Sequence, residues 1–322
     1  MFSARLLTAL AVLVLLGGHL GMAQPTSPAV APAPSLGTVR SWGYQLQNVD
    51  PDVLAASPYD LLVIDYSRDG SDALALAPQD LARLKVKPDG SRRIVLAYLS
   101  IGEAETYRYY WKWYWSWFFG MLAPSWRGPQ NAEWRGNYGV RYWQDDWQKI
   151  IFSGENSYLD RIIKAGFDGV YLDKVDEYEA MAKQNPKARA DMIAFVTALA
   201  ARARAARPGF LIVPQNGEGL LTDRGYRAVV DGLGKEDLLY GEEKGQRLND
   251  AESIKDNVAR LKLLTADHKP VFAVEYLDSP RDIEQARKQL EAYGFVPYFA
   301  DRALDQLRIG DLPNPKQKPG RK

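Results

Sequence analysis

The chain has 322 residues, of which 46% are hydrophobic and 25% are charged, a composition typical of globular proteins. With 41 basic and 40 acidic residues the net charge is +1, so the chain lacks the basic excess that nucleic-acid-binding proteins usually carry. The absence of cysteine excludes disulfide bonds and lipid attachment through cysteine, so the folded core must provide the stability by itself.

The first 23 residues have the pattern of a secretory signal peptide. Arg5 precedes an apolar run over residues 6–16, and the small residues Gly21 and Ala23 follow it. This order of basic, apolar and small residues is typical of a segment cleaved after Ala23. The apolar run is shorter than the roughly 20 residues that span a bilayer, which disfavours an uncleaved anchor. We therefore expect a secreted or periplasmic protein without a stable membrane anchor.

Two further segments lack the pattern of a folded domain. Residues 24–37 are rich in Pro, Ala and Ser and are predicted to form an extended linker. Residues 311–322 include the basic run NPKQKPGRK and are predicted to form a disordered tail. The folded domain is therefore expected to occupy residues 38–310.

Between these ends, apolar runs alternate with helical periodicity. The expected strands are residues 41–47, 61–66, 94–100, 169–173, 210–215, 228–233, 271–276 and 295–299. Several are continuous apolar runs, such as LLVID and IVLAYL, which suit parallel strands that are buried on both faces. Eight such strands favour a (β/α)8 TIM barrel. The alternative is a doubly wound sheet, which typically carries a Gly-rich phosphate loop after its first strand; WGYQLQNVDPD is not such a loop.

The inventory of residues disfavours several kinds of chemistry. After residue 23, His268 is the single histidine, which argues against a Ser-His-Asp triad and against the usual zinc sites. No P-loop or dinucleotide fingerprint is present, so we expect no cofactor. Asp173 and Asp176 raise the alternative of a metal site. Their spacing fits a helix start equally well, and no third ligand cluster is evident, so no metal is expected.

Carboxylates gather at the expected carboxyl ends of the strands, where barrel enzymes hold their catalytic groups. They are Asp65, Glu103, Glu105, Asp173, Asp176, Glu218, Glu236, Asp237, Glu275, Asp278 and Asp301. Any one of them alone could be a helix cap or a solvated loop charge. Their recurrence at nearly every strand end is typical of a glycosidase, in which one carboxylic acid protonates the leaving oxygen and a second carboxylate is the nucleophile or base.

The segment 107–147 contains eight of the nine tryptophans. It follows the third expected strand, where an extended loop would overhang the barrel mouth. The rings could form an aromatic wall for a polymer, or a local hydrophobic core or an association patch. We expect a mixture of packed and cleft-lining rings, without assigning individual tryptophans.

Several motifs together resemble those of glycoside hydrolase family 114. They are SWGYQLQ, LLVIDYS, VLAYLSIGEAETYRYYW, SWRGPQNAEWRGNYGVRYW, GFDGVYLDKVDEYE, VPQNGEGLL and EDLLYGEE, and they extend from about residue 42 to residue 299. Members of that family resemble endo-α-1,4-polygalactosaminidases, and some carry a cysteinyl-tRNA synthetase label that no nucleotide or zinc motif here supports. The resemblance implies a secreted (β/α)8 enzyme that cleaves polysaccharides containing α-1,4-linked galactosamine.

The resemblance also implies the site residues. The catalytic pair maps onto Asp173, as nucleophile or base, and Glu236, as general acid, with Glu218 and Glu242 as alternatives for the acid. Substrate contacts are expected at Asp65, Tyr98, Glu103, Asp176, Asn216, Glu218 and Tyr276. The expected partner is a polysaccharide, such as a cationic amino-sugar polymer, and not a nucleic acid. Two alternatives stay open, a non-catalytic glycan-binding barrel and a glycosidase for another polysaccharide, and so do the stereochemical outcome and the oligomeric state.

Overall fold

The computed structural model describes residues 34–116, 121–241, 247–309 and 312–313. The predicted signal peptide, most of the predicted linker and tail, and Glu242 lie outside these residues. The last part of the predicted linker is described, and it includes a 3₁₀ turn, η1 (Leu36–Thr38), whose Leu36 is buried in the core. A core residue therefore lies on the amino-terminal side of the predicted boundary at residue 38.

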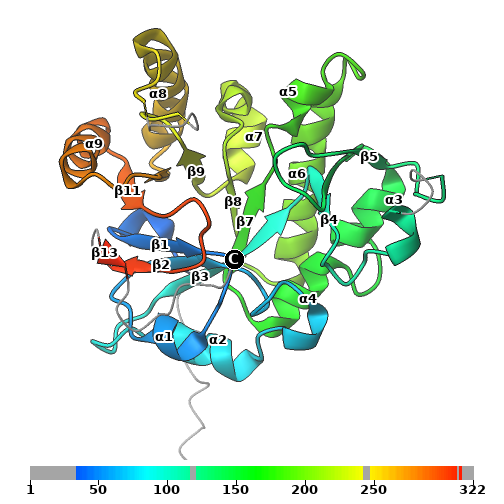
Figure 1. The fold of residues 1–322 in the computed structure, drawn as a ribbon, viewed down its shortest axis with the longest axis horizontal. Coiled ribbons are helices and arrows are strands. Elements are labelled where there is room, and N and C mark those ends of the chain that lie inside the picture. Colours follow the sequence, from blue (N-terminus) through cyan, green and yellow to red (C-terminus); the bar gives the residue numbers. More distant parts are fainter. Residues whose placement is uncertain (1–33, 117–120, 242–246, 310–311, 314–322) are drawn as a thin grey trace, which may run out of the picture. The chain divides into compact units, whose positions relative to one another are not determined.

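Two parallel sheets form the centre of the folded domain (Figure 1). The first has the order β1 (Trp42–Gln45), β2 (Leu61–Ile64), β3 (Ile94–Ser100), β7 (Gly169–Asp173) and β8 (Leu211–Pro214). The second has the order β11 (Val296–Phe299), β10 (Val271–Glu275) and β9 (Leu233–Glu236). All neighbours within both sheets are parallel.

Contacts at both edges join the two sheets into a barrel-like arrangement. At one edge a parallel bridge pairs Gln215, after β8, with Gly234 of β9. At the other edge the indole N–H of Trp42 on β1 donates to the carbonyl of Val296 on β11 at 3.0 Å, and the Trp42 and Tyr298 rings lie 5.5 Å apart. Among the described residues the order of the eight parallel strands is therefore that of a (β/α)8 barrel, as predicted.

The helices lie outside the strands because their buried residues recur on one face. They are α1 (Pro51–Ala55), α2 (Pro78–Leu84), α3 (Asp145–Gln148), α4 (Tyr158–Ala165), α5 (Glu177–Met181), α6 (Ala188–Ala206), α7 (Arg224–Val229), α8 (Ala251–Ala266) and α9 (Pro280–Tyr293). Helix α6 buries Met192, Phe195, Val196 and Leu199, as its periodicity predicts. Within the described ranges, no helix is long and apolar enough to cross a membrane.

The sixth strand differs from the prediction. Residues 228–233 were expected to form it, but helix α7 continues to Val229 and β9 begins at Leu233. Asp223 starts α7 because its side chain accepts from the backbone N–H of Tyr226 at 2.9 Å. The sequence of β9, LGKE, is too polar for the apolar pattern that identifies a buried strand. As a result Glu236 is the last residue of the strand itself and does not lie in the loop beyond it.

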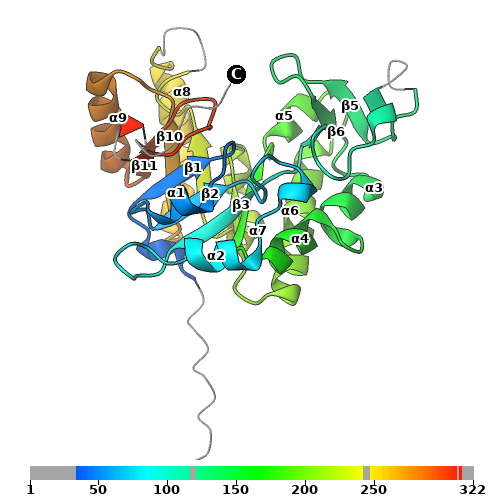
Figure 2. The ribbon, with the colours of Figure 1, turned by 60° about the horizontal axis from the view of Figure 1, so that its bottom comes forward.

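The long segment between β3 and β7 is a folded excursion, not an irregular loop. It contains an antiparallel sheet of β4 (Glu103–Glu105), β6 (Asn137–Val140) and β5 (Arg127–Gln130), in that order. Trp126 and Trp147 are buried in it with ring centroids 4.8 Å apart. Figures 1 and 2 place this excursion on the opposite side of the barrel from α8 and α9.

The remaining elements are short. They are the 3₁₀ turns η2 (Asp72–Leu74), η3 (Trp113–Ser116) and η6 (Glu218–Thr222), the π-helical turn η5 (Lys149–Ser153), and the two-residue strands β12 (Arg308–Ile309) and β13 (Leu312–Pro313). Turn η6 directly follows β8 and so begins near the carboxyl end of the parallel strands.

Candidate active site

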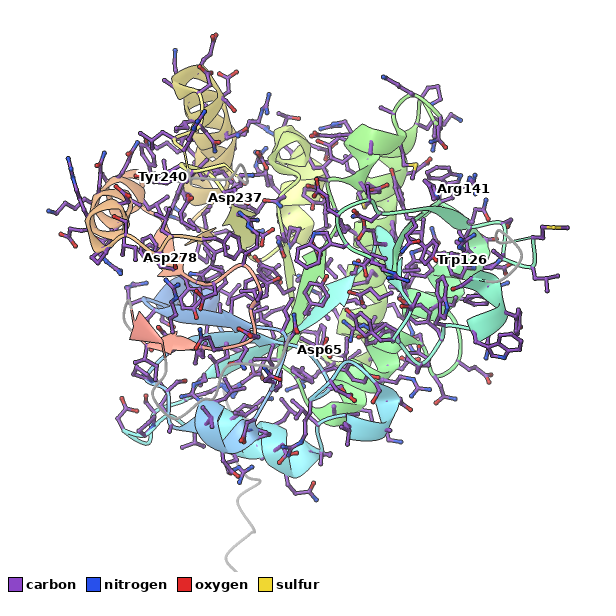
Figure 3. The ribbon with its side chains drawn as sticks, in the orientation of Figure 1. Asp65, Trp126, Arg141, Asp237, Tyr240 and Asp278 are labelled. Carbon is purple, nitrogen blue, oxygen red and sulfur yellow. The ribbon has the colours of Figure 1, made fainter. Side chains whose placement is uncertain are left out.

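A cavity of about 660 Å³ lies at the carboxyl ends of the parallel strands. Of the predicted site residues in the described ranges, those that line it are Asp65, Tyr98, Glu103, Asp173, Asp176, Asn216, Glu236 and Tyr276. Glu218 does not line it, because its carboxylate turns to the ammonium of Lys235 at 3.5 Å. Asp65, after β2, and Asp237, after β9, lie on different sides of the barrel (Figure 3).

Asp173 ends strand β7 with its carboxyl at this cavity. The register of β3 with β7 pairs Ser100 with Asp173, which brings the hydroxyl of Tyr98 to 2.6 Å from Asp173 Oδ2. The backbone N–H of Lys174 donates to Asp173 Oδ1 at 2.7 Å. Burial, together with the nearby Glu236 carboxyl, raises the pKa of Asp173 to about 7.

Glu236 ends strand β9 and faces the same cavity. Its carboxyl accepts a hydrogen bond from the hydroxyl of Tyr276 and one from the side-chain amide of Asn216 at 3.5 Å. The amide oxygen of Asn216 in turn accepts from the backbone N–H of Glu236 at 3.1 Å. Burial raises the pKa of Glu236, although the Tyr276 hydroxyl acts in the opposite direction. Each carboxyl of the predicted pair thus accepts from a tyrosine, Tyr98 on the neighbouring strand β3 or Tyr276 directly after the neighbouring strand β10.

Behind Asp65 lies a buried ion cluster that sequence reasoning missed. The guanidinium of Arg108 contacts Asp65 Oδ2 at 2.7 Å and Glu105 Oε2 at 2.5 Å, and its side chain is 1% exposed. Burial raises the pKa of Asp65 to about 6 while Arg108 lowers it. Asp65 therefore lines the cavity, but its charge is already paired.

A second missed pair lies beside Glu236. Asp237 has a φ of 50°, and both its oxygens accept from Arg302, at 2.7 and 3.1 Å. The Arg302 guanidinium also lies 4.2 Å from the centre of the Tyr276 ring, whose hydroxyl donates to Glu236. Arg302 follows the last parallel strand, so no local sequence signal links it to a glutamate 66 residues earlier in the chain.

Most of the described tryptophans of the excursion pack against other rings. Trp111 stacks on Tyr138 at 4.9 Å, and Trp115 meets Trp126 edge to face at 5.3 Å. Among the described tryptophans Trp134 alone lines the cavity, and 49% of it is exposed. Trp117 lies outside the described residues. In the described ranges the tryptophans are therefore the expected mixture, with one cleft-lining ring over a local hydrophobic core.

The arrangement provides acid and base chemistry from two carboxyls. The burial of both raises their pKa values, and because their charges repel, one of them readily keeps a proton near neutral pH. In the described part of the chain no group of three or more His, Cys, Asp or Glu side chains is arranged to hold a metal ion. A protonated carboxyl facing an ionised one is what glycosidic cleavage requires.

Comparisons with known proteins find a matching family model and similar sequences. A model described as glycoside-hydrolase family GH114 matches residues 22–311. An uncharacterized protein of Deinococcus radiodurans is 35% identical over 298 residues, which cover 89% of this chain and 90% of that protein.

Two solved structures share the fold. The glycoside hydrolase domain of PelA from Pseudomonas aeruginosa superposes with a TM-score of 0.62 at 21% identity, covering 83% of this chain and 96% of that chain. Aspergillus fumigatus Ega3, solved in complex with galactosamine, has a TM-score of 0.58 at 20% identity, covering 88% of this chain and 98% of that one.

Proposed function

We propose, from the premise that the chain belongs to glycoside-hydrolase family GH114, that it is an endo-acting enzyme that cleaves α-1,4-linked galactosamine-containing polysaccharide. The observation that carries the proposal is the pair of half-buried carboxyls, Asp173 and Glu236, at one cavity on the carboxyl ends of β7 and β9. Asp173 attacks the anomeric carbon or activates water, and Glu236 protonates the leaving oxygen.

The assignment of the two roles is supported by the hydrogen bonds around Asp173. Both of its oxygens have a donor at 2.7 Å or less, from Tyr98 and from the Lys174 backbone, and the Lys174 charge lowers its pKa. Three such influences favour the ionised form that a nucleophile or base needs. Around Glu236 the influences are mixed: burial and the negative charge of Asp237 raise its pKa, whereas the Tyr276 hydroxyl, Gln215 and the Lys235 charge lower it. The role of Glu236 as the acid therefore rests on the family resemblance.

The charge of the cavity supports an amino-sugar substrate. Seven acidic and five basic side chains line it. With one proton kept by the Asp173 and Glu236 pair, a small excess of negative charge remains, and such an excess attracts a polycation. The galactosamine bound in the structure of Aspergillus fumigatus Ega3 points to the same class of sugar. Trp134 adds an exposed ring at the edge, where a sugar face can stack.

The test is the release of oligosaccharides from partially deacetylated α-1,4-galactosaminoglycan, beside a panel of other polysaccharides, with products identified by mass spectrometry. Asp173→Asn should lower kcat by at least about 10³-fold. Full activity of Asp173→Asn would refute the role given to Asp173. Binding of the polymer without any product would favour a glycan-binding barrel, and products from another polymer in the panel would change the substrate.

Secretion is part of the same proposal. The apolar run over residues 6–16, followed by Ala23, supports export through a cleaved signal peptide. Amino-terminal sequencing of the protein recovered from outside the cytoplasm should begin at Gln24. A mature chain that still begins at Met1 would contradict cleavage.

A further inference from the structure

Lys174 follows Asp173 directly and has an unusual backbone conformation. Its φ is 59°, in the left-handed region that a residue with a side chain seldom adopts. Its backbone N–H donates to Asp173 Oδ1 at 2.7 Å. The backbone of Lys174 therefore binds the carboxyl of Asp173, while its side-chain ammonium can contact a different residue.

The ammonium of Lys174 goes to Glu103, the first residue of the excursion sheet. Lys174 Nζ lies 3.3 Å from Glu103 Oε1. The Glu103 carboxylate also accepts from the side-chain amides of Asn131 at 2.7 Å and Asn137 at 3.2 Å. The Glu103 side chain is 5% exposed. Both oxygens of this buried carboxylate already accept from donors of the protein. Such a carboxylate positions its neighbours and has little capacity left to bind a sugar hydroxyl.

The backbone around this pair is closely packed. A Cβ on Gly102 would lie 2.3 Å from the carbonyl oxygen of Lys174 and 2.8 Å from its Cβ, so only glycine fits without a shift. The N–H of Ile101 donates to the Asp173 carbonyl at 3.0 Å. The start of the excursion is therefore fixed on the turn that follows Asp173.

We propose that Glu103 is a positioning residue that acts on Asp173 through Lys174. Glu103 holds the ammonium of Lys174 in one place, so that the cation compensates the neighbouring Asp173 carboxylate to a fixed degree. This inference rests on the proposed role of Asp173, and it replaces the predicted role of Glu103 as a substrate contact.

Other charges act on the same two groups. Those that influence Asp173 are Glu236, Tyr98, Lys174 and Asp176, and those that raise the pKa of Lys174 are Glu103, Asp173 and Asp176. Glu177 interacts with both Lys174 and Glu103. Without Glu103, the ammonium is drawn toward Asp173 and Asp176, the remaining carboxylates that raise its pKa.

The test is an NMR titration of the Asp173 carboxyl carbon in the full chain labelled with ¹³C-aspartate, assigned by its loss in Asp173→Asn. Glu103→Gln should lower the pKa of Asp173 by about half a unit, and Lys174→Gln should raise it by about one unit. In the Lys174→Gln background, Glu103→Gln should lose most of its effect. Lys174→Arg, which keeps the cation, should stay near the wild-type value.

Glu284→Gln is the matched control, because Glu284 forms an exposed pair with Lys288 at 2.9 Å on α9; it should not move the titration. If Glu103→Gln shifts the pKa of Asp173 equally with and without Lys174, the action through Lys174 is refuted. An unchanged pKa in Glu103→Gln together with a raised KM would restore Glu103 as a substrate contact. The titration needs no turnover, so a coupled shift in a chain that cleaves no polymer of the panel would overturn the substrate while supporting this inference.

Discussion

The two sides of the cavity each position one carboxyl, and they do so with different parts of the chain. On each side a tyrosine hydroxyl donates to a carboxyl, and an ion pair lies next to it: Tyr98 with Lys174 and Glu103 beside Asp173, and Tyr276 with Arg302 and Asp237 beside Glu236. The Asp173 side depends on the excursion, whose first strand provides Glu103. The Glu236 side depends on β10 and on the segment after β11. The two carboxyls thus act together in the proposed reaction, whereas the segments that position them are different parts of the chain.

The largest expected effects separate the roles of the two carboxyls. Glu236→Gln should lower kcat/KM by about 10³-fold on the polymer. Its loss should be much smaller on an aryl galactosaminide with a good leaving group, because such a group needs no proton. Asp173→Asn should be inactive on both substrates. The measurement is the ratio of kcat/KM for the two substrates, and equal losses of Glu236→Gln on both would contradict its role as the acid.

The tyrosines should move different limbs of the pH profile. Each hydroxyl lowers the pKa of the carboxyl that accepts from it, so its removal raises that pKa. If Asp173 must be ionised, kcat/KM rises with pH through about 7, and Tyr98→Phe should shift this acid limb to higher pH. Tyr276→Phe should shift the basic limb instead, and each variant should lose about ten-fold in kcat. If both variants shift the same limb, the assignment of one limb to Asp173 and the other to Glu236 is wrong.

One glycine on each side tests how tightly the supports are packed. A Cβ on Gly102 would lie 2.3 Å from the Lys174 carbonyl, and a Cβ on Gly234 would lie 1.9 Å from the Tyr171 hydroxyl. Gly102→Ala and Gly234→Ala should each lower the free energy of unfolding by about 1–3 kcal/mol, measured by urea denaturation. Gly37→Ala is the control, since its nearest atom would be 3.7 Å away. A stability unchanged from wild type in either variant would show that its neighbours can move aside.

The smallest expected effect concerns Glu275, which supports the Glu236 side. Its buried carboxyl accepts from the backbone N–H groups of Leu239 at 2.8 Å and Tyr240 at 3.1 Å, and burial raises its pKa to about 8. The folded state binds the Glu275 proton more tightly than the unfolded state. The contribution of this proton to the free energy of unfolding is therefore fully present below about pH 4.5 and is lost as the pH rises toward about 8.

Glu275→Gln imitates the protonated carboxyl and should flatten the decline of the unfolding free energy between about pH 5 and 8. Thermal melts across this range provide the measurement. Glu291→Gln, at an exposed position on α9, should leave the decline as it is. A decline as steep in Glu275→Gln as in wild type would mean that this carboxyl is ionised throughout.

The contrast between the two sides also explains what the sequence could predict. Asp173 ends an apolar run, GVYLD, so the pattern of a buried parallel strand marks it directly. Glu236 ends the polar strand LGKE, and the pattern there placed the strand over residues 228–233, too early in the chain. The sequence pattern still placed Glu236 among the carboxylates near the strand ends, whereas its role as the acid came from the family resemblance.

The ion pairs could not be predicted because their partners are distant in sequence. Asp65 and Arg108 are 43 residues apart, and Asp237 and Arg302 are 65 residues apart. Such pairs form only once the strands are arranged in space, and a single sequence carries no signal for them. The packing of the tryptophans could not be predicted either, because it depends on the register of the excursion sheet.

The crowding of tryptophans into the excursion also has an optical consequence. Eight of the nine indoles lie within residues 107–147, and the remaining one, Trp42, lies at the start of β1. Intrinsic fluorescence therefore reports mainly on one side of the cavity, whereas far-ultraviolet circular dichroism reports on the helices of the barrel. If the excursion opens before the barrel melts, the two signals separate along a denaturation curve. The molecule thus carries its own emissive label on the part of the chain that supports Asp173.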